Sequence, residues 1–196
     1  MKLSILGARG QIAGSLIALY EAKGSLHDLA LYSRAPESLT AKFEGAAIYP
    51  SKDFAKNRHE VIVNCIGVPN LKGVQPSGVE IFETHEMWDN MILAYLKKNS
   101  RSLYINLSSG AVYGKNFHEP VNEGSGFLSG VTEMSPVDFY AVSKLNAEAK
   151  HRALERLSIV DLRVFSYVSR FIDFNSNFLV AELIKAIKDK QVFMTD

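Results

Sequence analysis

The chain has 196 residues, of which 47% are hydrophobic and 22% are charged, and its formal net charge is +1. This length and composition fit a globular protein with a sizeable core, and the balanced charge argues against nucleic acid or an anionic membrane as a partner. A single cysteine, Cys65, excludes an intramolecular disulfide and favours a reducing compartment. No apolar run approaches the ~20 residues that a membrane-spanning helix needs. We therefore expect a cytoplasmic protein without a membrane segment.

The first stretch is an apolar run followed at once by a glycine turn. Leu3 to Leu6 predicts a buried strand, and the apolar periodicity after residue 13 predicts a helix that stops near Gly24. Between them lies Gly7-Ala8-Arg9-Gly10-Gln11-Ile12-Ala13. Glycines here would let the backbone approach a pyrophosphate, to which the helix N-terminus would offer free N–H groups. A dinucleotide site is one interpretation of this turn, and a plain tight turn is the other.

The second predicted strand, Leu29 to Tyr32, ends in Ser33-Arg34. In dinucleotide-binding folds, the end of this strand carries the residue that senses the adenosine ribose. An acidic side chain there would bond a free 2′-hydroxyl, whereas a guanidinium matches the geometry of a 2′-phosphate. Ser33 and Arg34 therefore favour NADP over NAD. The alternative is an ordinary surface arginine after a strand.

The middle of the chain predicts two more strands, a loop and a long helix. These elements are Ala46 to Tyr49, Glu60 to Gly67, residues 68–79, and about Ile81 to Lys98. The second of these strands is apolar on both faces, as a central parallel strand is, and its last residue would lie beside the adenine-side ribose. We interpret Cys65 as a small buried hydrophobe and His85 as a structural residue, and we predict no metal site.

The second half of the chain predicts two strands, two helices and a surface loop. They are Leu103 to Leu107, residues 115–135 as the loop, a helix from Pro136 to about Leu157, Ile159 to Phe165, and a helix over Asn177 to Lys188. The fifth strand runs into Ser108 and Ser109, which would present hydroxyls at the carboxyl edge of the sheet, where open α/β sheets bind ligands. Six strands that alternate with helices predict an α/β protein, a Rossmann-type doubly wound parallel sheet flanked by helices.

The helix after the surface loop carries a tyrosine and a lysine four residues apart. If this segment is helical, Tyr140 and Lys144 lie on one face, roughly 6 Å apart at Cβ. A fixed cation beside a phenol favours the phenolate and lowers its pKa, so the pair could transfer protons near neutral pH. The alternative is a solvated lysine stem that lies on a ring.

Taken in order, these motifs resemble the extended short-chain dehydrogenase/reductases, a family of NAD(P)-dependent nucleotide-sugar epimerases, dehydratases and reductases. The resemblance covers residues 3 to about 170. It rests on Gly7-x-x-Gly10, Ser108-Ser109 before Val112-Tyr113-Gly114, Tyr140-x-x-x-Lys144 with Glu148, and Leu162-Arg163-Val164-Phe165.

The resemblance implies a role for each matching residue. Tyr140 would be the general base or acid, Lys144 would bond the nicotinamide ribose and lower the tyrosine's pKa, and Ser109 would bond the reacting oxygen. The implied cofactor is NADP by preference, or NAD. The candidate cofactor-binding residues are Gly7, Arg9, Gly10, Gln11, Ile12, Ser33, Arg34, Cys65, Ile66, Gly67, Ser108, Tyr140, Lys144, Phe165 and Ser166.

Two departures from the family's pattern bear on the chemistry. Gly110-Ala111 stands where dehydratases of the family carry an acidic pair, which disfavours elimination. Thr84 stands at a position that the family often fills with asparagine, which puts a proton relay through it in doubt.

The implied organisation is a cofactor domain over residues 1–170 and, over 171–196, the beginning of a truncated or missing smaller substrate-binding domain. The implied activity is that of a nucleotide-sugar epimerase or reductase, with hydride transfer at a sugar carbon. The alternative is a regulatory or scaffold protein that senses NADP on the same fold without turnover. The family also pairs subunits through the helices that here contain Trp88 to Tyr95 and Tyr140 to Leu157, so the resemblance implies a homodimer.

Overall fold

The computed structural model describes residues 2–68, 76–114, 120–122, 125, 132, 134–174 and 179–192. The loops predicted at residues 68–79 and 115–135 lie largely outside these residues. Within the described parts of the chain, no helix is long and apolar enough to cross a membrane.

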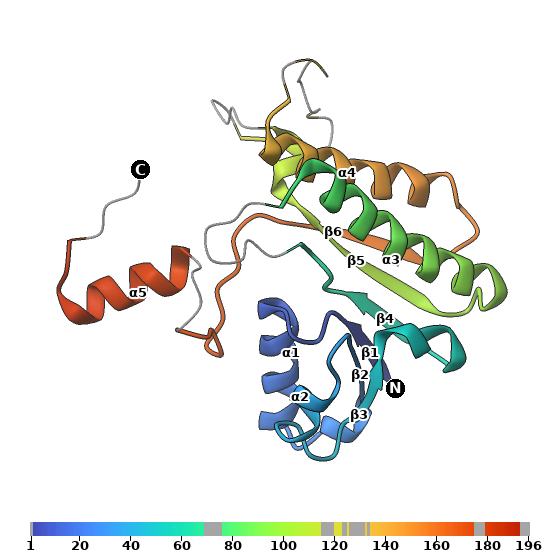
Figure 1. Cartoon of the computed structure of the whole chain (residues 1–196), viewed down its shortest axis with the longest axis horizontal. Helices are drawn as coiled ribbons and strands as arrows, with labels where there is room; N and C mark the ends of the chain where they lie inside the picture. Colours follow the sequence, from blue (N-terminus) through green and yellow to red (C-terminus); the bar gives the residue numbers. More distant parts are fainter. Residues whose placement is uncertain are drawn as a thin grey trace.

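Six parallel strands form one sheet in the order β3-β2-β1-β4-β5-β6 (Figure 1). The strands are β1 (Leu3–Leu6), β2 (Leu29–Ser33), β3 (Ala47–Pro50), β4 (Val61–Asn64), β5 (Leu103–Ser109) and β6 (Ile159–Val164). The strand order reverses between β1 and β4, which pair directly, with Leu3 opposite Val61. The predicted doubly wound parallel sheet is therefore confirmed, and its switch point lies at this central pair.

The strand boundaries differ from the predicted ones at two places that concern the site. β4 ends at Asn64, before the predicted Gly67, because the side-chain Oδ1 of Asn64 accepts the N–H of Ile66 at 3.0 Å and takes that group out of the ladder. β5 continues beyond Leu107 to Ser109, because β6 pairs with it that far, with Ser109 opposite Val164.

Five α-helices are described. They are α1 (Gln11–Ala22), α2 (Glu37–Thr40), α3 (Gly78–Lys98), α4 (Pro136–Arg152) and α5 (Leu179–Asp189). α4 ends before the predicted Leu157, where Leu154 and Leu157 turn inward and pack against the core. The last turn of α4 is basic, which suits the negative end of a helix dipole.

An apolar core fills one face of the sheet, under α1. Ile17 and Ala13 of α1 are fully buried against apolar side chains of β1, β2 and β4. The sheet-side members of this core are Leu3, Ile5, Leu29, Leu31, Val61 and Val63. This face extends onto β5 and β6, where Val160 and Leu162 are 42% and 45% exposed.

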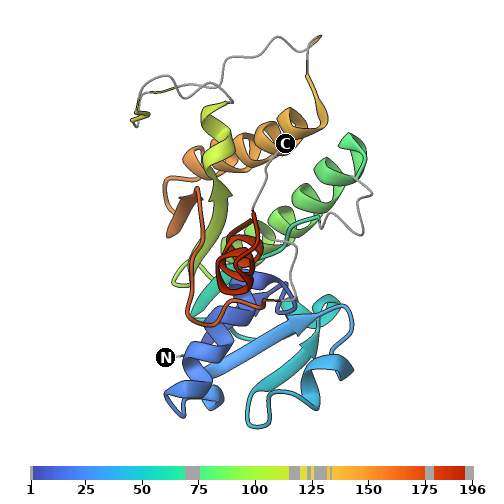
Figure 2. The same ribbon diagram turned by 90° about the vertical axis from the view of Figure 1, so that its left-hand side faces the viewer.

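The opposite face of the sheet is covered by α3 and α4, which lie together in Figures 1 and 2 and are joined by hydrogen bonds from Asn146 to Glu86 and from Lys150 to Asn90. A second core cluster of Leu6, Ala30, Tyr32, Phe54, Ile62, Ile92, Leu93, Tyr95, Leu96 and Tyr104 lies on this face. The short helix that contains Phe54 follows β3 directly.

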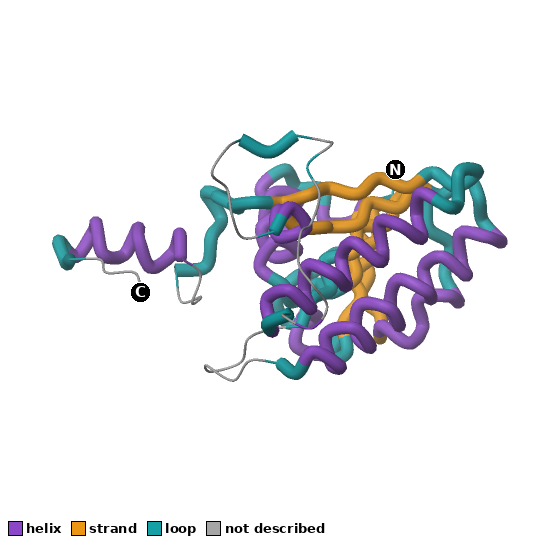
Figure 3. The backbone as a smooth tube through the Cα atoms, turned by 90° about the horizontal axis from the view of Figure 1, so that it is seen from above, coloured by secondary structure: helices purple, strands orange, loops and turns teal. Residues whose placement is uncertain are grey.

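α5 stands beside the sheet layers in Figures 1 and 3. It is strongly amphipathic in sequence, with Ala181 and Ala186 buried and Leu179, Leu183 and Ile187 exposed. The helix confirms the predicted periodicity near residues 177–188, of which 177 and 178 lie outside the described residues. The assignment of 171–196 to a substrate-binding domain stays a prediction.

Candidate active site

The glycine turn after β1 touches the end of β4. Gly7 has a positive φ of 71°, which glycine adopts without strain. A Cβ on Gly7 would lie 3.0 Å from the backbone C and O of Cys65, and a Cβ on Gly10 would lie 3.2 Å from O of Gly7. The turn therefore depends on both glycines, because neighbouring backbone leaves little room for a side chain at either position. We call this turn, with the end of β4 and the start of α1, the cradle; it lies at the switch point of the sheet.

α1 begins at this turn with its N-terminal N–H groups uncapped. Gly10 is the N-cap, no side chain in the described part of the chain caps it, and the first turn has no acidic residue. By contrast, α3 begins with a capping box between Ser77 and Glu80. The positive end of α1 is thus available to an anion. Gln11 and Ile12 are half-buried in its first turn, and Arg9 is exposed.

The end of β2 lies next to the glycine turn, because β2 pairs with β1. Ser33 is buried, and its Oγ accepts the N–H of Ala35 at 3.1 Å. Arg34 is exposed at the same edge. The serine therefore shapes the turn after the strand, and the guanidinium is free to meet a group outside the sheet.

The end of β4 supplies the other wall of the cradle. N of Cys65 donates to O of Leu6 at 3.0 Å, which holds the two central strands together beyond their last pair. Burial raises the pKa of the Cys65 thiol to about 12, against a smaller opposite effect of the ammonium of Lys144. The thiol is therefore neutral at pH 7, as its interpretation as a small hydrophobe requires. Ile66 is half-buried and Gly67 is exposed.

Ser109 and Tyr140 meet at the end of β5. Ser109 is the last residue of the strand, and its Oγ accepts the N–H of Ala111 at 3.2 Å. The same hydroxyl lies near the phenol of Tyr140 on α4 and, as a hydrogen-bonding group, opposes the rise that burial causes in the pKa of that phenol. The structure thus brings together two of the three residues for which the sequence predicts a catalytic role.

Lys144, the third of these residues, is 5% exposed and lies one turn beyond Tyr140 on α4. Its Nζ donates to O of Leu107 at 2.9 Å and lies 5.7 Å from the centroid of the Tyr140 ring. Burial lowers the pKa of this ammonium to about 8, and the carboxylates of Asp89 and Asp161 oppose that effect.

The predicted lowering of the Tyr140 pKa by Lys144 is wrong for this arrangement. Burial raises the pKa of the phenol, and only the nearby hydroxyl of Ser109 opposes that rise. The physical reason is that the ammonium points to the carbonyl of Leu107, while the phenol is removed from water. In this conformation Tyr140 is a neutral phenol that can donate a proton.

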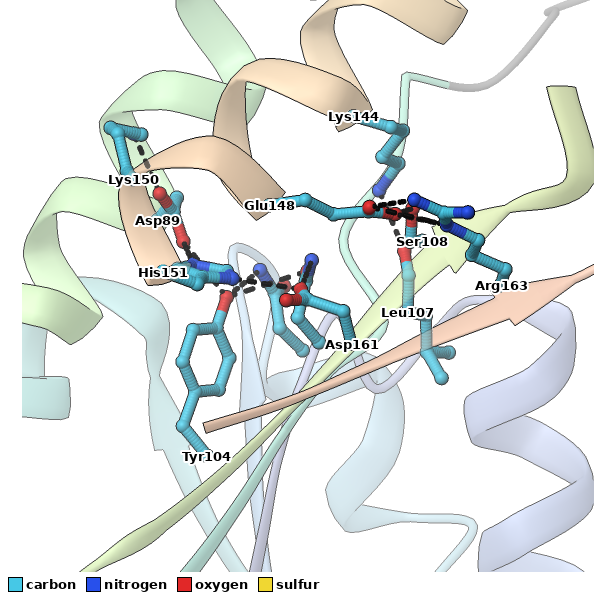
Figure 4. A network of polar contacts seen from close by, with 12 residues as sticks. Asp89, Tyr104, Leu107, Ser108, Lys144, Glu148, Lys150, His151, Asp161 and Arg163 are labelled. Carbon is cyan, nitrogen blue, oxygen red and sulfur yellow. Dashed lines mark hydrogen bonds and ion pairs between the residues drawn. The ribbon is translucent and has the colours of Figure 1, made fainter. Parts of the chain in front are cut away.

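Ser108 points away from this pair, into the core between the sheet and α4. Its hydroxyl donates to Glu148 at 2.5 Å, and Glu148 accepts a bidentate pair of hydrogen bonds from Arg163 of β6 (Figure 4). Any contact of Ser108 with a cofactor would therefore come from its backbone.

The predicted cofactor-side residues after β6 lie at the surface. Phe165 is 59% exposed, and Ser166 is exposed. The ring of Phe165 stacks on Tyr113 with centroids 5.6 Å apart, and the guanidinium of Arg163 covers the same tyrosine at 4.6 Å. Phe165 also lies over Gly110, where a side chain would collide with it. This stack sets the path of the chain after β6.

A second set of buried charges lies deeper on the same face. The imidazole of His151 bridges Asp89 of α3 and Asp161 of β6, at 2.8 and 2.7 Å (Figure 4). Burial alone lowers the pKa of His151, but its hydrogen bonds with the two carboxylates outweigh this and raise the pKa to about 9. Asp89 also pairs with Lys150 at 2.6 Å and accepts from Tyr104 at 3.1 Å. This network fixes α3, α4 and β6 relative to one another behind the Ser109–Tyr140 pair.

The whole chain was then compared with known proteins. The profile of the NAD dependent epimerase/dehydratase family matches residues 3–195. The chain belongs to this family. No curated protein sequence matches it.

Solved structures share the fold of this family member at low sequence identity. The UDP-N-acetylglucosamine 4-epimerase of Methanobrevibacter ruminantium, in complex with UDP-N-acetylmuramic acid, superposes with a TM-score of 0.72 at 19% identity over 100% of this chain and 66% of that one. The UDP-glucose 4-epimerase of Thermotoga maritima, with UDP-glucose, gives 0.74 at 15% identity over 99% and 66%. The UDP-glucuronic acid 4-epimerase of Bacillus cereus, with NAD, gives 0.63 at 19% identity over 97% and 63%. This epimerase/dehydratase chain thus spans slightly less than two thirds of their length.

His85 is a residue of the site whose position the sequence did not predict. Its ring packs edge-on against Tyr140, with centroids 5.5 Å apart, and its Nδ1 lies 2.7 Å from Oγ of Ser143. The histidine is 7% exposed. The available signal was spacing: His85 and Asp89 are four residues apart on α3, and Lys144 and His151 are seven apart on α4, so each pair shares a helix face.

Proposed function

We propose that this chain binds NAD(P) and takes part in hydride transfer at a carbon of a nucleotide-linked sugar, as an epimerase or reductase with Tyr140 as the general acid and base. The observation that carries this proposal is the proximity of the Ser109 hydroxyl to the Tyr140 phenol at the carboxyl edge of the sheet, close enough to affect the pKa of that phenol. It places two proton-carrying groups where a substrate hydroxyl or carbonyl could meet both. Membership of the epimerase/dehydratase family supports the same reaction class.

The cradle around the switch point fits a dinucleotide. Its glycine turn is backbone packed closely on the end of β4, and the uncapped end of α1 supplies N–H groups and a positive dipole for a pyrophosphate. A bound nicotinamide dinucleotide would accept and return the hydride. A neighbour crystallised with NAD has the same fold.

Side chains of this protein would then transfer the proton and orient the substrate and the cofactor. Tyr140 would take the proton of the sugar hydroxyl when the carbon is oxidised and give it back on reduction. Ser109 would hold the reacting oxygen by its hydroxyl. Lys144 would bond the ribose of the cofactor with an N–H bond that does not go to Leu107, and its charge would then lie closer to the phenol.

Arg34 supports a preference for NADP within this proposal. It is exposed after β2, and the side chain that shapes the turn is the neutral Ser33, so no carboxylate stands at either position to bond a 2′-hydroxyl. A guanidinium binds a 2′-phosphate through a planar pair of N–H bonds.

We also propose pairing of two copies through α3 and α4. The outer surface of these helices has a hollow lined by Leu93, Ala94, Ala153 and Leu154, with Lys97 and Lys150 at its edge. Two copies of such a hollow could pack as a four-helix bundle. Sedimentation equilibrium tests this directly, and a monomer at all concentrations would exclude it.

The function is tested by substituting Tyr140. We expect Tyr140→Phe to keep the affinity for reduced cofactor, measured by its fluorescence, and to lower the turnover of a UDP-hexose by about 10²–10⁴-fold, because general acid–base catalysis contributes on that order. Product formation is measured by chromatography of the sugar nucleotides. Turnover that is unchanged by this substitution would remove Tyr140 from the mechanism. Cofactor binding without turnover of any nucleotide sugar in the parent would favour an NADP-sensing regulator instead.

The cofactor preference is tested separately at Arg34. We expect the parent to bind NADPH more tightly than NADH by roughly tenfold, the size of a partly solvated charge-assisted pair. Arg34→Ala should erase the difference by weakening NADPH binding alone. Arg9→Ala, at the glycine turn, is the control and should affect both cofactors equally. Equal affinity of the parent for both cofactors would refute the assignment of Arg34.

A further inference from the structure

A small cavity lies directly behind the Tyr140–Lys144 pair, between the sheet and helices α3 and α4. Its volume is about 10 Å³, close to the least space that holds one water molecule. It is lined by Asn64, Ile66, His85, Trp88, Asp89, Asn106, Lys144 and Ala147. The lining thus includes two amides, a carboxylate, an imidazole and an ammonium, and a cavity with such polar groups is one that proteins fill with water.

The polar side chains around the cavity have protein partners, with one exception. Oδ1 of Asn64 accepts from the N–H of Ile66, and its Nδ2 donates to the hydroxyl of Tyr104. Nδ2 of Asn106 donates to Oδ1 of Asp161. Asp89 is held by His151, Tyr104 and Lys150. Two buried atoms of the lining lack a hydrogen bond among the described residues. One is Oδ2 of Asp89, which still forms an ion pair with Lys150 at 2.6 Å; the exception is Nε2 of His85, which has neither.

The hydrogen bonds of Ser143 determine whether Nε2 of His85 is a hydrogen-bond donor or an acceptor. Oγ of Ser143 donates its only proton to O of Tyr140 at 2.7 Å. The contact between this Oγ and Nδ1 of His85 at 2.7 Å must therefore be a donation from Nδ1–H. Burial, with the nearby charge of Lys144, lowers the pKa of His85 to about 3, so the ring is neutral. Nε2 of His85, a residue that lines the cavity, is then a hydrogen-bond acceptor without a donor partner among the described residues.

Lys144 offers the complementary donors. An ammonium has three N–H bonds, and in the described part of the chain only one of them, to O of Leu107, has a protein acceptor. Lys144 and His85 both line the cavity. A buried ammonium with two further N–H bonds and a buried imidazole nitrogen without a partner therefore border one space of the size of a water molecule.

We propose that this cavity binds a single water molecule that accepts a hydrogen bond from Nζ of Lys144 and donates one to Nε2 of His85. His85 is then a positioning residue, which orients the lysine beside Tyr140 through that water. The inference concerns the apo protein, and its importance for turnover rests on the proposed role of Lys144.

The chemistry of the surroundings explains why such a water matters. Lys144 loses much of its hydration in the core, and the charged form needs acceptors. The titratable groups around the ammonium are Tyr140 on its own helix, Asp89 and His85 on α3, Cys65 after β4 and Asp161 on β6. Among them Asp89 and Asp161 are charged to its benefit, and both carboxylates already accept from other donors. A water backed by a neutral imidazole supplies the missing acceptor without adding a charge.

The first test is a crystal structure of the apo protein at high resolution. We expect one ordered water within hydrogen-bonding distance of both Nε2 of His85 and Nζ of Lys144. An empty cavity, or a water bonded to neither atom, would overturn the proposal.

The second test is the titration of Lys144 by NMR in protein labelled at lysine, with the signal assigned by Lys144→Met. Because His85→Phe keeps the ring but removes the acceptor, we expect the pKa of Lys144 to fall by roughly one pH unit. His85→Gln, which retains an acceptor, should restore part of the parent value.

The matched control is His59→Phe. His59 is a buried imidazole like His85, but both of its ring nitrogens have protein partners, Ser4 and Phe54, and it lies at the amino end of β4. The His59→Phe variant should have a lower free energy of unfolding than the parent and the same titration of Lys144. An unchanged pKa of Lys144 in His85→Phe would refute the proposal. Failure of the parent to bind reduced cofactor would refute the proposed function and leave both of these tests intact.

Discussion

The two faces of β5 differ in chemistry within a single strand. Leu103, Ile105 and Leu107 alternate along it with Tyr104, Asn106 and Ser108. The apolar set continues the core under α1, and the polar set points into the layer of α3 and α4, where all three form side-chain hydrogen bonds. At β5 one face of the sheet therefore packs by burial, whereas the other face adds partnered polar groups to its own apolar core.

Apolar packing and buried hydrogen bonds contribute differently to the stability of the fold and to the exact placement of side chains. Apolar packing tolerates small shifts, because burial is not directional. Hydrogen bonds between buried groups are lost within a few tenths of an ångström, and a buried group without its partner is costly. The polar groups on the α3 and α4 side of β5 are therefore suited to holding Ser109, Tyr140 and Lys144 in one arrangement, while both apolar cores contribute burial to stability.

The largest expected effect is on the α3 and α4 side of the sheet, at His151. His151→Gln removes the cation between the carboxylates of Asp89 and Asp161 and leaves them facing each other, so we expect a loss of about 3–5 kcal/mol in the free energy of unfolding below neutral pH. The folded-state pKa is raised to about 9. The stabilisation is therefore complete below the unfolded value of about 6.5 and is lost as the pH rises through about 9.

Urea unfolding of the parent and the variant at about pH 6 and about pH 9.5 measures this change. The gap between the two proteins should shrink with increasing pH by up to about 1.4 kcal/mol per unit. His27→Gln is the control, because the His27 side chain is 74% exposed, and it should give no such dependence. A gap for His151→Gln that is constant with pH would show that the imidazole is neutral when folded.

The next effect tests the apolar core under α1. Leu31 is fully buried under α1, and Leu31→Ala should cost about 2–5 kcal/mol through lost burial and the cavity left behind. Leu162→Ala removes the same atoms on the same face at a site that is 45% exposed, and should cost about 0.5 kcal/mol or less. Equal losses for the two variants in urea unfolding would show that burial at Leu31 contributes no more to stability than the partly exposed Leu162.

The smallest expected effect is at Glu148. Glu148→Gln keeps the shape of the side chain but weakens its bonds with Arg163 and Ser108, so we expect a loss of about 1–3 kcal/mol. Thermal unfolding by circular dichroism measures it. The cofactor affinity should change little, because these groups face the core. A variant as stable as the parent would show that the desolvation of this ion pair cancels its attraction.

Much of the fold could be predicted from the sequence, because its signals are local. Short apolar runs, the glycines after Leu6 and the alternation of strands with helices are sufficient for a doubly wound sheet. The resemblance to a family added the pairing of Ser109 with Tyr140, which lie far apart in the chain. Neither source indicated the strand end at Asn64, because a side-chain hydrogen bond decides it, whereas the resemblance did place the end of the fifth strand at Ser108-Ser109.

The polar layer was largely unpredictable for a physical reason. Asp89, His151 and Glu148 lie on helices, where charged residues usually face solvent, and only the contact of three elements buries them. The pKa of Tyr140 escaped prediction for a similar reason: sequence spacing placed Lys144 nearby, but not the carbonyl of Leu107 that binds its ammonium. In such a layer the partners are chosen by tertiary structure.

The direct pairing of β1 with β4 has a consequence for how the chain folds. β2 and β3 pair with strands that lie close in sequence, whereas Leu3 must find Val61 across two crossovers. Loop closure of this length costs entropy that is recovered only when the pairing is complete, so we expect this step to be formed late and to limit the folding rate. Gly7, whose missing side chain lets the backbone pass Cys65, lies at the end of this pairing. Its replacement by alanine should therefore slow refolding as well as distort the cradle.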